Sequence, residues 1–196
     1  ARQAREVIAG DVVTLGLLAG GRGERVGGRD KAWLPRKGRP ALDGLLQEIG
    51  NTAFAQRLAS VRAQDPRWAL REFTCVQDLR PGQPGPLGGL EALAAACRTP
   101  WLLVLPVDVF DLPENLLDRL AQLATPQGAW LRDAGGLQPL LGLWPAAALQ
   151  GAAASALDAG EAAVHRALAT LCPATLDISP ARLGNANTPE AYDRTP

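Results

Sequence analysis

Continuous apolar runs alternate along this chain with segments whose apolar residues recur every three or four positions. Residues 12–19 and 101–105 are apolar runs short enough to be single strands buried on both faces. Apolar residues within 41–49 instead have the spacing of one helix face. Strands that alternate with helices are typical of a parallel sheet. The pattern therefore predicts an α/β domain in which helices cover both faces of a mostly parallel sheet.

The later segments continue this alternation. We expect strands at residues 73–76 and 175–179, and a pair of strands on either side of an Asp-Ala-Gly-Gly turn, within residues 130–144. Helical spacing predicts further helices at residues 53–63, 91–97, 113–123, 145–156 and 162–171.

Composition supports one compact domain. The chain has 196 residues, of which 47% are hydrophobic, enough for a full core. Its 20 basic and 20 acidic residues balance, so no global field attracts nucleic acid or an anionic membrane, and neither is an expected partner. No apolar stretch reaches the length of a membrane helix and no signal-peptide pattern appears, so we expect a cytoplasmic protein.

Cysteine and methionine usage adds two expectations. The three cysteines are widely spaced among apolar residues, which predicts buried thiols rather than a disulfide framework or metal site. Because the chain contains no methionine, residues 1–11 are expected to be a tag remnant or an arm, and residues 12–196 a single domain.

A glycine-rich basic loop follows the first predicted strand. Five glycines fall within residues 20–28, and Arg22, Arg25 and Lys31 add positive charge. Glycines let backbone N–H groups approach an anion, so the loop predicts a polyphosphate site rather than a merely flexible surface loop. It is no Walker A loop, because Ala32 stands where the hydroxyl residue should follow the lysine. A dinucleotide fingerprint fails too, because Val26 occupies its third small position.

Residues 18–34 read Leu-Ala-Gly-Gly-Arg-Gly-Glu-Arg-Val-Gly-Gly-Arg-Asp-Lys-Ala-Trp-Leu. This segment resembles the LAGGxxxRMGGxDKxLL signature of the molybdenum cofactor guanylyltransferases, which are nucleotidyltransferases with a three-layer Rossmann-like fold. Val26 and Trp33 replace the family's Met and first closing Leu. The resemblance implies that Arg25 and Lys31 act in catalysis. It also implies nucleotide contacts by residues of this segment: Leu18, Ala19, Gly20, Gly21, Arg22 and Lys31.

The family next has a strand that ends in a Ser-Ala-Asn-Arg-like sequence. Here Gly50-Asn51-Thr52 joins the helix at residues 41–49 directly to the helical pattern at residues 53–63. We therefore expect this strand to be absent, either because a segment near Gly50 is missing or because the protein has lost it. Asn51 is the expected counterpart of the family's nucleotide-contacting polar residue.

Asp78 follows the predicted strand at residues 73–76, which is where an open parallel sheet presents ligand-binding groups. From its neighbours alone, a turn-forming aspartate before Pro81-Gly82 is the better interpretation. The segment that follows, Gly85-Pro86-Leu87-Gly88-Gly89-Leu90, resembles the GPLxGL motif that closes over the nucleotide base in the family. The resemblance thus implies nucleotide contacts by Asp78, Gly85, Pro86 and Leu87.

Asp108 comes just after the apolar run at residues 101–105, near the expected switch point of the sheet. Magnesium binds one or two carboxylates together with phosphate oxygens and water, so we expect Asp108 to bind Mg²⁺ and to act in catalysis. Residues 106–113 resemble the family's PCDxPxLP motif, although Phe110 replaces a proline and Asp111 adds a carboxylate. Asp111 is the expected N-cap of the helix at residues 113–123.

The acceptor side is implied by two later motifs. One is Gln138-Pro139, and the other is the sequence from Asn185 to Glu190, which matches the family's NxNTPE. The resemblance implies that Gln138, Asn185 and Asn187 contact the pterin substrate. His165, the single histidine, is expected at the surface, because transfer to an ionised phosphate needs no proton abstraction.

The resemblance implies transfer of GMP from GTP to molybdopterin or Mo-molybdopterin, with Mg²⁺ as cofactor. It divides the domain into a nucleotide half at about residues 12–112 and an acceptor half at about 113–192. Cofactor biosynthesis proteins or molybdoenzyme chaperones are the implied partners. Two alternatives stay open: a related nucleotidyltransferase of CTP or sugar-1-phosphate type, and an inert nucleotide-binding homologue.

Overall fold

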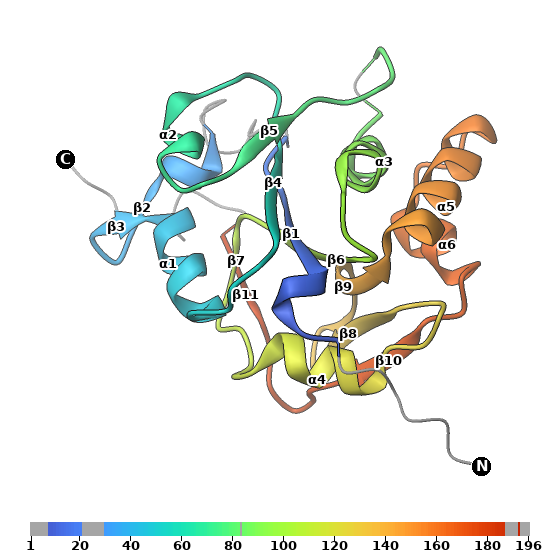
Figure 1. Ribbon diagram of the computed structural model, residues 1–196. Helices are drawn as coiled ribbons and strands as arrows, with labels where there is room; N and C mark the ends of the chain where they lie inside the picture. The colour runs from blue at the N-terminus through green and yellow to red at the C-terminus, as the bar shows by residue number, and fades with distance from the viewer. Residues whose placement is uncertain (1–7, 21–29, 83, 187–191, 193–196) are drawn as a thin grey trace.

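A seven-stranded sheet forms the centre of the molecule (Figure 1). The structure is a computed structural model that describes residues 8–20, 30–82, 84–186 and 192. The strands lie in the order β10-β8-β9-β6-β1-β4-β5. Their bounds are β1 Val13–Leu18, β4 Gln56–Ser60, β5 Thr74–Val76, β6 Trp101–Pro106, β8 Ala129–Asp133, β9 Gly136–Pro145 and β10 Ala174–Asp177.

Only β9 runs against the other strands of this sheet. It is antiparallel to β6 and β8, whereas β1 pairs in parallel with β4 and β6, β4 with β5, and β8 with β10. The predicted mostly parallel sheet is thus confirmed. The predicted pair of strands about the Asp-Ala-Gly-Gly turn is also confirmed, because Asp133 pairs with Gly136 across it.

Helices cover both faces of the sheet. One face carries α1 Ala41–Ile49, α2 Pro66–Ala69 and α4 Leu116–Leu123, and the other carries α3 Pro86–Ala96, α5 Ala146–Asp158 and α6 Val164–Ala169 (Figure 1). In β6, Leu103 and Leu105 pack into the first core, while Leu102 and Val104 pack into the second. A strand buried on both faces is apolar at every position, which explains the continuous apolar run.

Two expectations about residues 50–63 are wrong: the helix at residues 53–63 and the absence of the family's second strand. The second strand is present as β4, parallel to β1, so neither a missing segment nor a lost strand is needed. Gly50 ends α1 with a φ of 78°, a conformation that glycine adopts readily. The hydrophobic pattern did not predict this strand, because its first residue, Gln56, is polar and forms hydrogen bonds within the fold. Its side chain accepts from the backbone N–H of Arg98 and donates to the carbonyl of Ala96.

Two helix starts also differ from the prediction. Helix α3 begins at Pro86 rather than at residue 91, because Gly85 turns the chain with a φ of 73° and proline suits the first turn. Helix α4 begins at Leu116, and Asn115 precedes it with a φ of 52°. Asp111 has a φ of 58° and lies four residues before Asn115, so it does not cap this helix.

Short elements complete the described structure. They are the 3₁₀ helices η1 Gly10–Val12 and η3 Lys31–Trp33, the hairpin β2 Pro35–Arg36 with β3 Arg39–Pro40, and the pair β7 Val109–Phe110 with β11 Gly184–Asn185. All three cysteines are free, as expected, but Cys172 is exposed rather than buried, and Cys75 and Cys97 are only partly buried. Among the described residues, none of the helices is both long and apolar enough to cross a membrane.

Candidate active site

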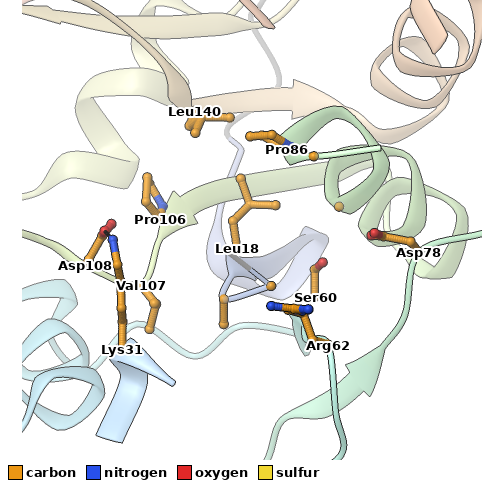
Figure 2. Close-up of a pocket in the computed structure, with 14 residues that line it drawn as sticks. Leu18, Lys31, Ser60, Arg62, Asp78, Pro86, Pro106, Val107, Asp108 and Leu140 are labelled. Carbon is orange, nitrogen blue, oxygen red and sulfur yellow. Dashed lines mark hydrogen bonds and ion pairs between the residues drawn. The ribbon is translucent and has the colours of Figure 1, made fainter. Parts of the chain in front are cut away.

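A cavity of about 390 Å³ lies at the carboxyl ends of β1, β4 and β6, beside the first turn of α3 (Figure 2). Parallel strands that end at one edge bring together residues far apart in sequence, which is where open α/β sheets bind ligands. The lining residues are Leu18, Ala19, Gly20, Lys31, Ser60, Arg62, Asp78, Gly85, Pro86, Gly89, Pro106, Val107, Asp108 and Leu140.

Lys31 and Asp108 meet at one end of this cavity (Figure 2). Lys31 Nζ donates to Asp108 Oδ2 at 2.5 Å, and the two side chains are 21% and 12% exposed. Helix η3 presents the lysine, and its N-cap Asp30 accepts from the backbone N–H of Ala32 at 3.0 Å. Burial raises the pKa of Asp30. The structure thus brings together the cation and the carboxylate that the sequence predicts for a triphosphate and its metal.

Trp33 anchors helix η3 to the rest of the fold. Its ring packs edge to face on the fully buried ring of Trp68, with ring centroids 5.1 Å apart. The guanidinium of Arg67 lies 4.3 Å from the centroid of Trp33 and that of Arg71 lies 5.0 Å away. Arg71 is itself held by both carboxylate oxygens of Asp43 on α1. The tryptophan that replaces a leucine of the signature therefore fixes the short helix that carries Lys31.

Asp78 lies at the opposite end of the cavity, just past β5 (Figure 2). Burial, together with the charge of Glu91, raises the pKa of Asp78. A Cβ built on Gly88 would lie 3.3 Å from the Asp78 carboxylate, so the missing side chain lets the start of α3 approach it closely. Arg80 holds the loop that follows, because its guanidinium donates to both oxygens of Glu91 and to Asp158.

Ser60 and Arg62 line the cavity between these two ends, and the sequence analysis missed both. The signal was present, since Ser60-Val61-Arg62-Ala63 stands at the end of β4, where the family has its Ser-Ala-Asn-Arg-like sequence. Arg62 thus occupies the polar position that we expected Asn51 to fill. Asn51 itself is exposed and precedes β4, at the amino-terminal edge of the sheet, so the structure does not bring it to the cavity.

A second cavity of about 310 Å³ adjoins the first, because Pro106 and Leu140 line both. Gln138 and Asn185 line it together, as the acceptor-side prediction requires. It also contains Asp133 and Arg182, which the sequence analysis did not single out.

Asp133 is a fixed anion in the wall of the second cavity. It is 3% exposed, and its carboxylate accepts from Gln138 Nε2 at 3.0 Å and from the backbone N–H groups of Gly135 and Leu183. Burial opposes the charge, but these hydrogen bonds and the charge of Arg182 outweigh it and lower the pKa of Asp133. This bond fixes the orientation of the Gln138 amide, and no hydrogen bond from another described residue reaches its oxygen.

The loop that departs from the family motif is ordered by pairing. Val109 and Phe110 form β7, which is antiparallel to β11. The guanidinium of Arg36 lies 3.4 Å from the centroid of the Phe110 ring, and the ring also packs closely over Gly184. Tyr192 packs into the same small core, where burial raises its pKa. Phe110 therefore replaces the expected proline with a side chain that packs against this small core.

Several predicted site residues lie outside the described residues or away from the cavities. Gly21, Arg22, Arg25 and Asn187 lie outside the described residues. Leu87 is fully buried in the core between α3 and the sheet and does not line the cavity.

No group of three possible metal ligands occurs among the described residues. A magnesium ion that arrives with a triphosphate needs one or two protein carboxylates. Asp108, an oxygen donor at the edge of the cavity, fits this requirement.

The comparisons with known proteins identify the family of the chain. The model of the MobA-like NTP transferase domain matches residues 16–172. The chain is 35% identical over 179 residues to a molybdenum cofactor guanylyltransferase from Pseudomonas aeruginosa, an alignment that covers 89% of each chain. It is 36% identical over 181 residues to the protein of that name from Pseudomonas syringae pv. syringae, with 88% of each chain covered.

A solved structure shares the fold. The molybdopterin-guanine dinucleotide biosynthesis protein A from Archaeoglobus fulgidus superposes with a TM-score of 0.63 at 19% identity, covering 91% of this chain and 94% of that one. The match to the family model runs from β1 to the segment before β10, so it includes every residue that lines the first cavity and the lining residues of the second up to Leu141. The chain therefore belongs to the family of MobA-like NTP transferases, which is the family that its glycine-rich signature predicts.

Proposed function

We propose that this protein transfers GMP from GTP to the terminal phosphate of molybdopterin or Mo-molybdopterin and releases pyrophosphate. The observation that carries the proposal is the pair of adjoining cavities. The first has Lys31 and Asp108 at one end and Asp78 at the other, and the second has Gln138 and Asn185 in its wall. The names of the relatives, molybdenum cofactor guanylyltransferases, support the choice of substrates.

In this proposal the acceptor phosphate attacks the α-phosphorus of GTP, and the bond from that phosphorus to the β-phosphate oxygen breaks. Because both reactants are anions, the protein must neutralise charge and align the attack. Lys31 would bind the triphosphate, with Arg22 and Arg25 from the loop that follows β1. No proton needs to be abstracted from an ionised phosphate. His165 lies on α6 and lines neither cavity, which is consistent with this.

Asp108 would hold a magnesium ion that arrives with the nucleotide. The ion, when bound, neutralises negative charge on the phosphates. In the structure Asp108 pairs with Lys31, so both side chains would exchange partners when the nucleotide binds. The Lys31–Asp108 pair keeps the two charges close together and mostly shielded from water until then.

The acceptor would lie in the second cavity, with its phosphate toward Pro106 and Leu140, the residues shared with the first. Asn185 and the amide oxygen of Gln138 are suited to bind the polar edge of a pterin. Asp133 holds Gln138 in that orientation.

The test is a pyrophosphate-release assay with purified protein and Mg²⁺. GTP and CTP are each tested with molybdopterin as acceptor, and a sugar-1-phosphate is tested as the alternative acceptor with a nucleoside triphosphate. Mass spectrometry would identify the dinucleotide product. Lys31→Met should reduce turnover about 100-fold or more. Lys37→Met is the matched control, since Lys37 is the only other lysine and lies exposed in the β2–β3 turn.

Near-normal activity of Lys31→Ala or Asp108→Ala in the GTP assay would refute the assignment of these residues. Pyrophosphate release with CTP but not GTP would favour a cytidylyl transfer, and nucleotide binding without any release would favour an inert homologue. The strand that the sequence was expected to lack, a loss that would favour an inert homologue, is present as β4.

A further inference from the structure

Strand β9 bulges at residues 139–141. In β8, the adjacent residues Trp130 and Leu131 pair with Gly142 and Gln138 of β9, which leaves the three residues between them without a partner. On its other side β9 pairs with β6 only through the four residues that follow the bulge. The bulge begins with a proline, which has no backbone N–H to donate to a neighbouring strand. Both neighbours thus part from β9 beside the end of β6, and the second cavity lies between them.

The bulge places Leu140 between the two cavities. Leu141 is 1% exposed and packs into the first core, whereas Leu140 is only partly buried and packs against the second core. Leu140 lines both cavities, and Pro106 is the only other described residue that does so. Figure 2 shows Leu140 on the side of the first cavity where Pro86 and Pro106 also lie. The junction of the cavities is therefore walled by Leu140 and Pro106, whose side chains have no hydrogen-bonding group.

The proposed transfer has to take place at this junction. A nucleotide in the first cavity and an acceptor in the second can meet only where the two cavities adjoin. The α-phosphorus then lies beside Leu140 and Pro106, where the acceptor phosphate can approach it. Water is a second nucleophile that can attack the same phosphorus. The transfer therefore needs a wall here that admits the acceptor phosphate and excludes water.

Resting on the proposed function, we propose that Leu140 determines which nucleophile attacks, because it excludes water from the α-phosphorus of the bound nucleotide. A cavity holds an ordered water only where polar groups bind it, and an aliphatic side chain offers neither a donor nor an acceptor. The bulge has a role in this specificity, because it directs to the junction a side chain that regular pairing would keep within the sheet.

A smaller side chain in place of Leu140 admits water, and water then hydrolyses the nucleotide. In that reaction the water oxygen bonds to the α-phosphorus, and the bond from this phosphorus to the β-phosphate oxygen breaks. The products are GMP and pyrophosphate, and the two protons of the water pass to the pyrophosphate and to the solvent. Hydrolysis is thus measured as GMP, which transfer to the acceptor does not release.

The experiment measures the rate of GMP formation from GTP and Mg²⁺, without acceptor, by the wild type and three variants of Leu140. Leu140→Ala should raise this rate about 10-fold or more, and Leu140→Val should raise it less. Leu140→Met nearly conserves the volume of the side chain, so it should stay within about twofold of the wild type. Leu137→Ala is the matched control: Leu137 lies on the same strand, is also partly buried against the second core, and lines neither cavity.

A second arm with molybdopterin present separates this role from a structural one. The ratio of GMP to dinucleotide should rise from the wild type through Leu140→Val to Leu140→Ala. A loss of packing alone would lower the midpoint of thermal unfolding and slow both reactions together, without a change in this ratio. Thermal unfolding is measured for each variant, and Leu140→Val, which removes a single methylene, serves as the test if the alanine variant does not fold.

Unchanged GMP formation in a folded Leu140→Ala would overturn the inference. An equal rise in Leu137→Ala would overturn it as well, because any loosening of β9 would then admit water. The proposed function fails separately. If Leu140→Ala hydrolyses GTP faster than the wild type but the wild type forms no dinucleotide with molybdopterin, the inference stands and the transfer reaction does not. If the wild type forms the dinucleotide and no variant forms more GMP, the transfer stands and the inference does not.

Discussion

The Lys31–Asp108 ion pair holds a cation that a triphosphate would need, so Asp108→Asn should affect binding and turnover in opposite directions. The Nζ–Oδ2 distance is 2.5 Å, and the side chains are 21% and 12% exposed. Exposed pairs contribute ~0.2–1 kcal/mol. Breaking a buried pair costs ~3–5 kcal/mol. Because this pair is partly buried, its contribution should lie between these two ranges. Release of Lys31 should therefore make about 1–2 kcal/mol available to an anionic ligand.

The assay has two arms. In the first, GTP binding is measured in EDTA, where the substitution should tighten binding about 5- to 30-fold, the equivalent of 1–2 kcal/mol. In the second, turnover with Mg²⁺ and acceptor should fall about 100-fold or more, because the carboxylate proposed to hold the metal is gone. Asp111→Asn is the control, an exposed carboxylate that does not line either cavity.

The result that refutes this reasoning is metal-free GTP that binds Asp108→Asn no more tightly than the wild type. Lys31 would then not be exchanged between Asp108 and the phosphates. Unchanged turnover in the second arm would remove Asp108 from the proposed metal site.

Three further substitutions test other parts of the structure. Asp78→Asn should raise the free energy of unfolding at pH 7, because the folded protein raises the pKa of Asp78 and so disfavours its charged form. Urea denaturation at a series of pH values should show this gain over the wild type disappear toward pH 4, below which the unfolded carboxyl is also protonated. Trp68→Ala should lower the free energy of unfolding by ~3–5 kcal/mol in the same measurement, because it empties a fully buried site. Gly184→Ala would bring a Cβ within 1.8 Å of Phe110 Cε2, so it should cost ~1–3 kcal/mol and raise the KM for molybdopterin while GTP affinity stays unchanged in a binding assay.

The elements that could be predicted are those whose signal is local. Strands β1 and β6 are continuous apolar runs, because a strand buried on both faces needs an apolar residue at every position. Helix α1 has its predicted bounds, since its apolar positions and Gly50 lie within one segment. Lys31 and Asp108 were predicted for the same reason: each follows a run that predicts a strand, and strand ends of a parallel sheet share one edge.

Strand β4 and the residues beyond it depend instead on tertiary pairing. Gln56 is polar in sequence, but Thr14 of β1 and the backbone of Ala96 and Arg98, at and just after the end of α3, supply its hydrogen-bond partners from distant segments. Once β4 lies between β1 and β5, Arg62 faces the cavity and Asn51 lies at the other edge. No local pattern contains that information, because it is the pairing of strands that determines which end of the segment meets the site.

The sequence by itself determined the family, the mostly parallel sheet and the two charges that meet at the end of β6, since motifs and buried runs are properties of short segments. Only the tertiary structure decided which polar residues complete the two cavities. Asp133 and Arg182 belong to the second because β8 and the segment after β10 are adjacent in the fold, where the backbone N–H of Leu183 binds Asp133. Such contacts join positions 50 residues apart, and a burial pattern read along one segment cannot contain them.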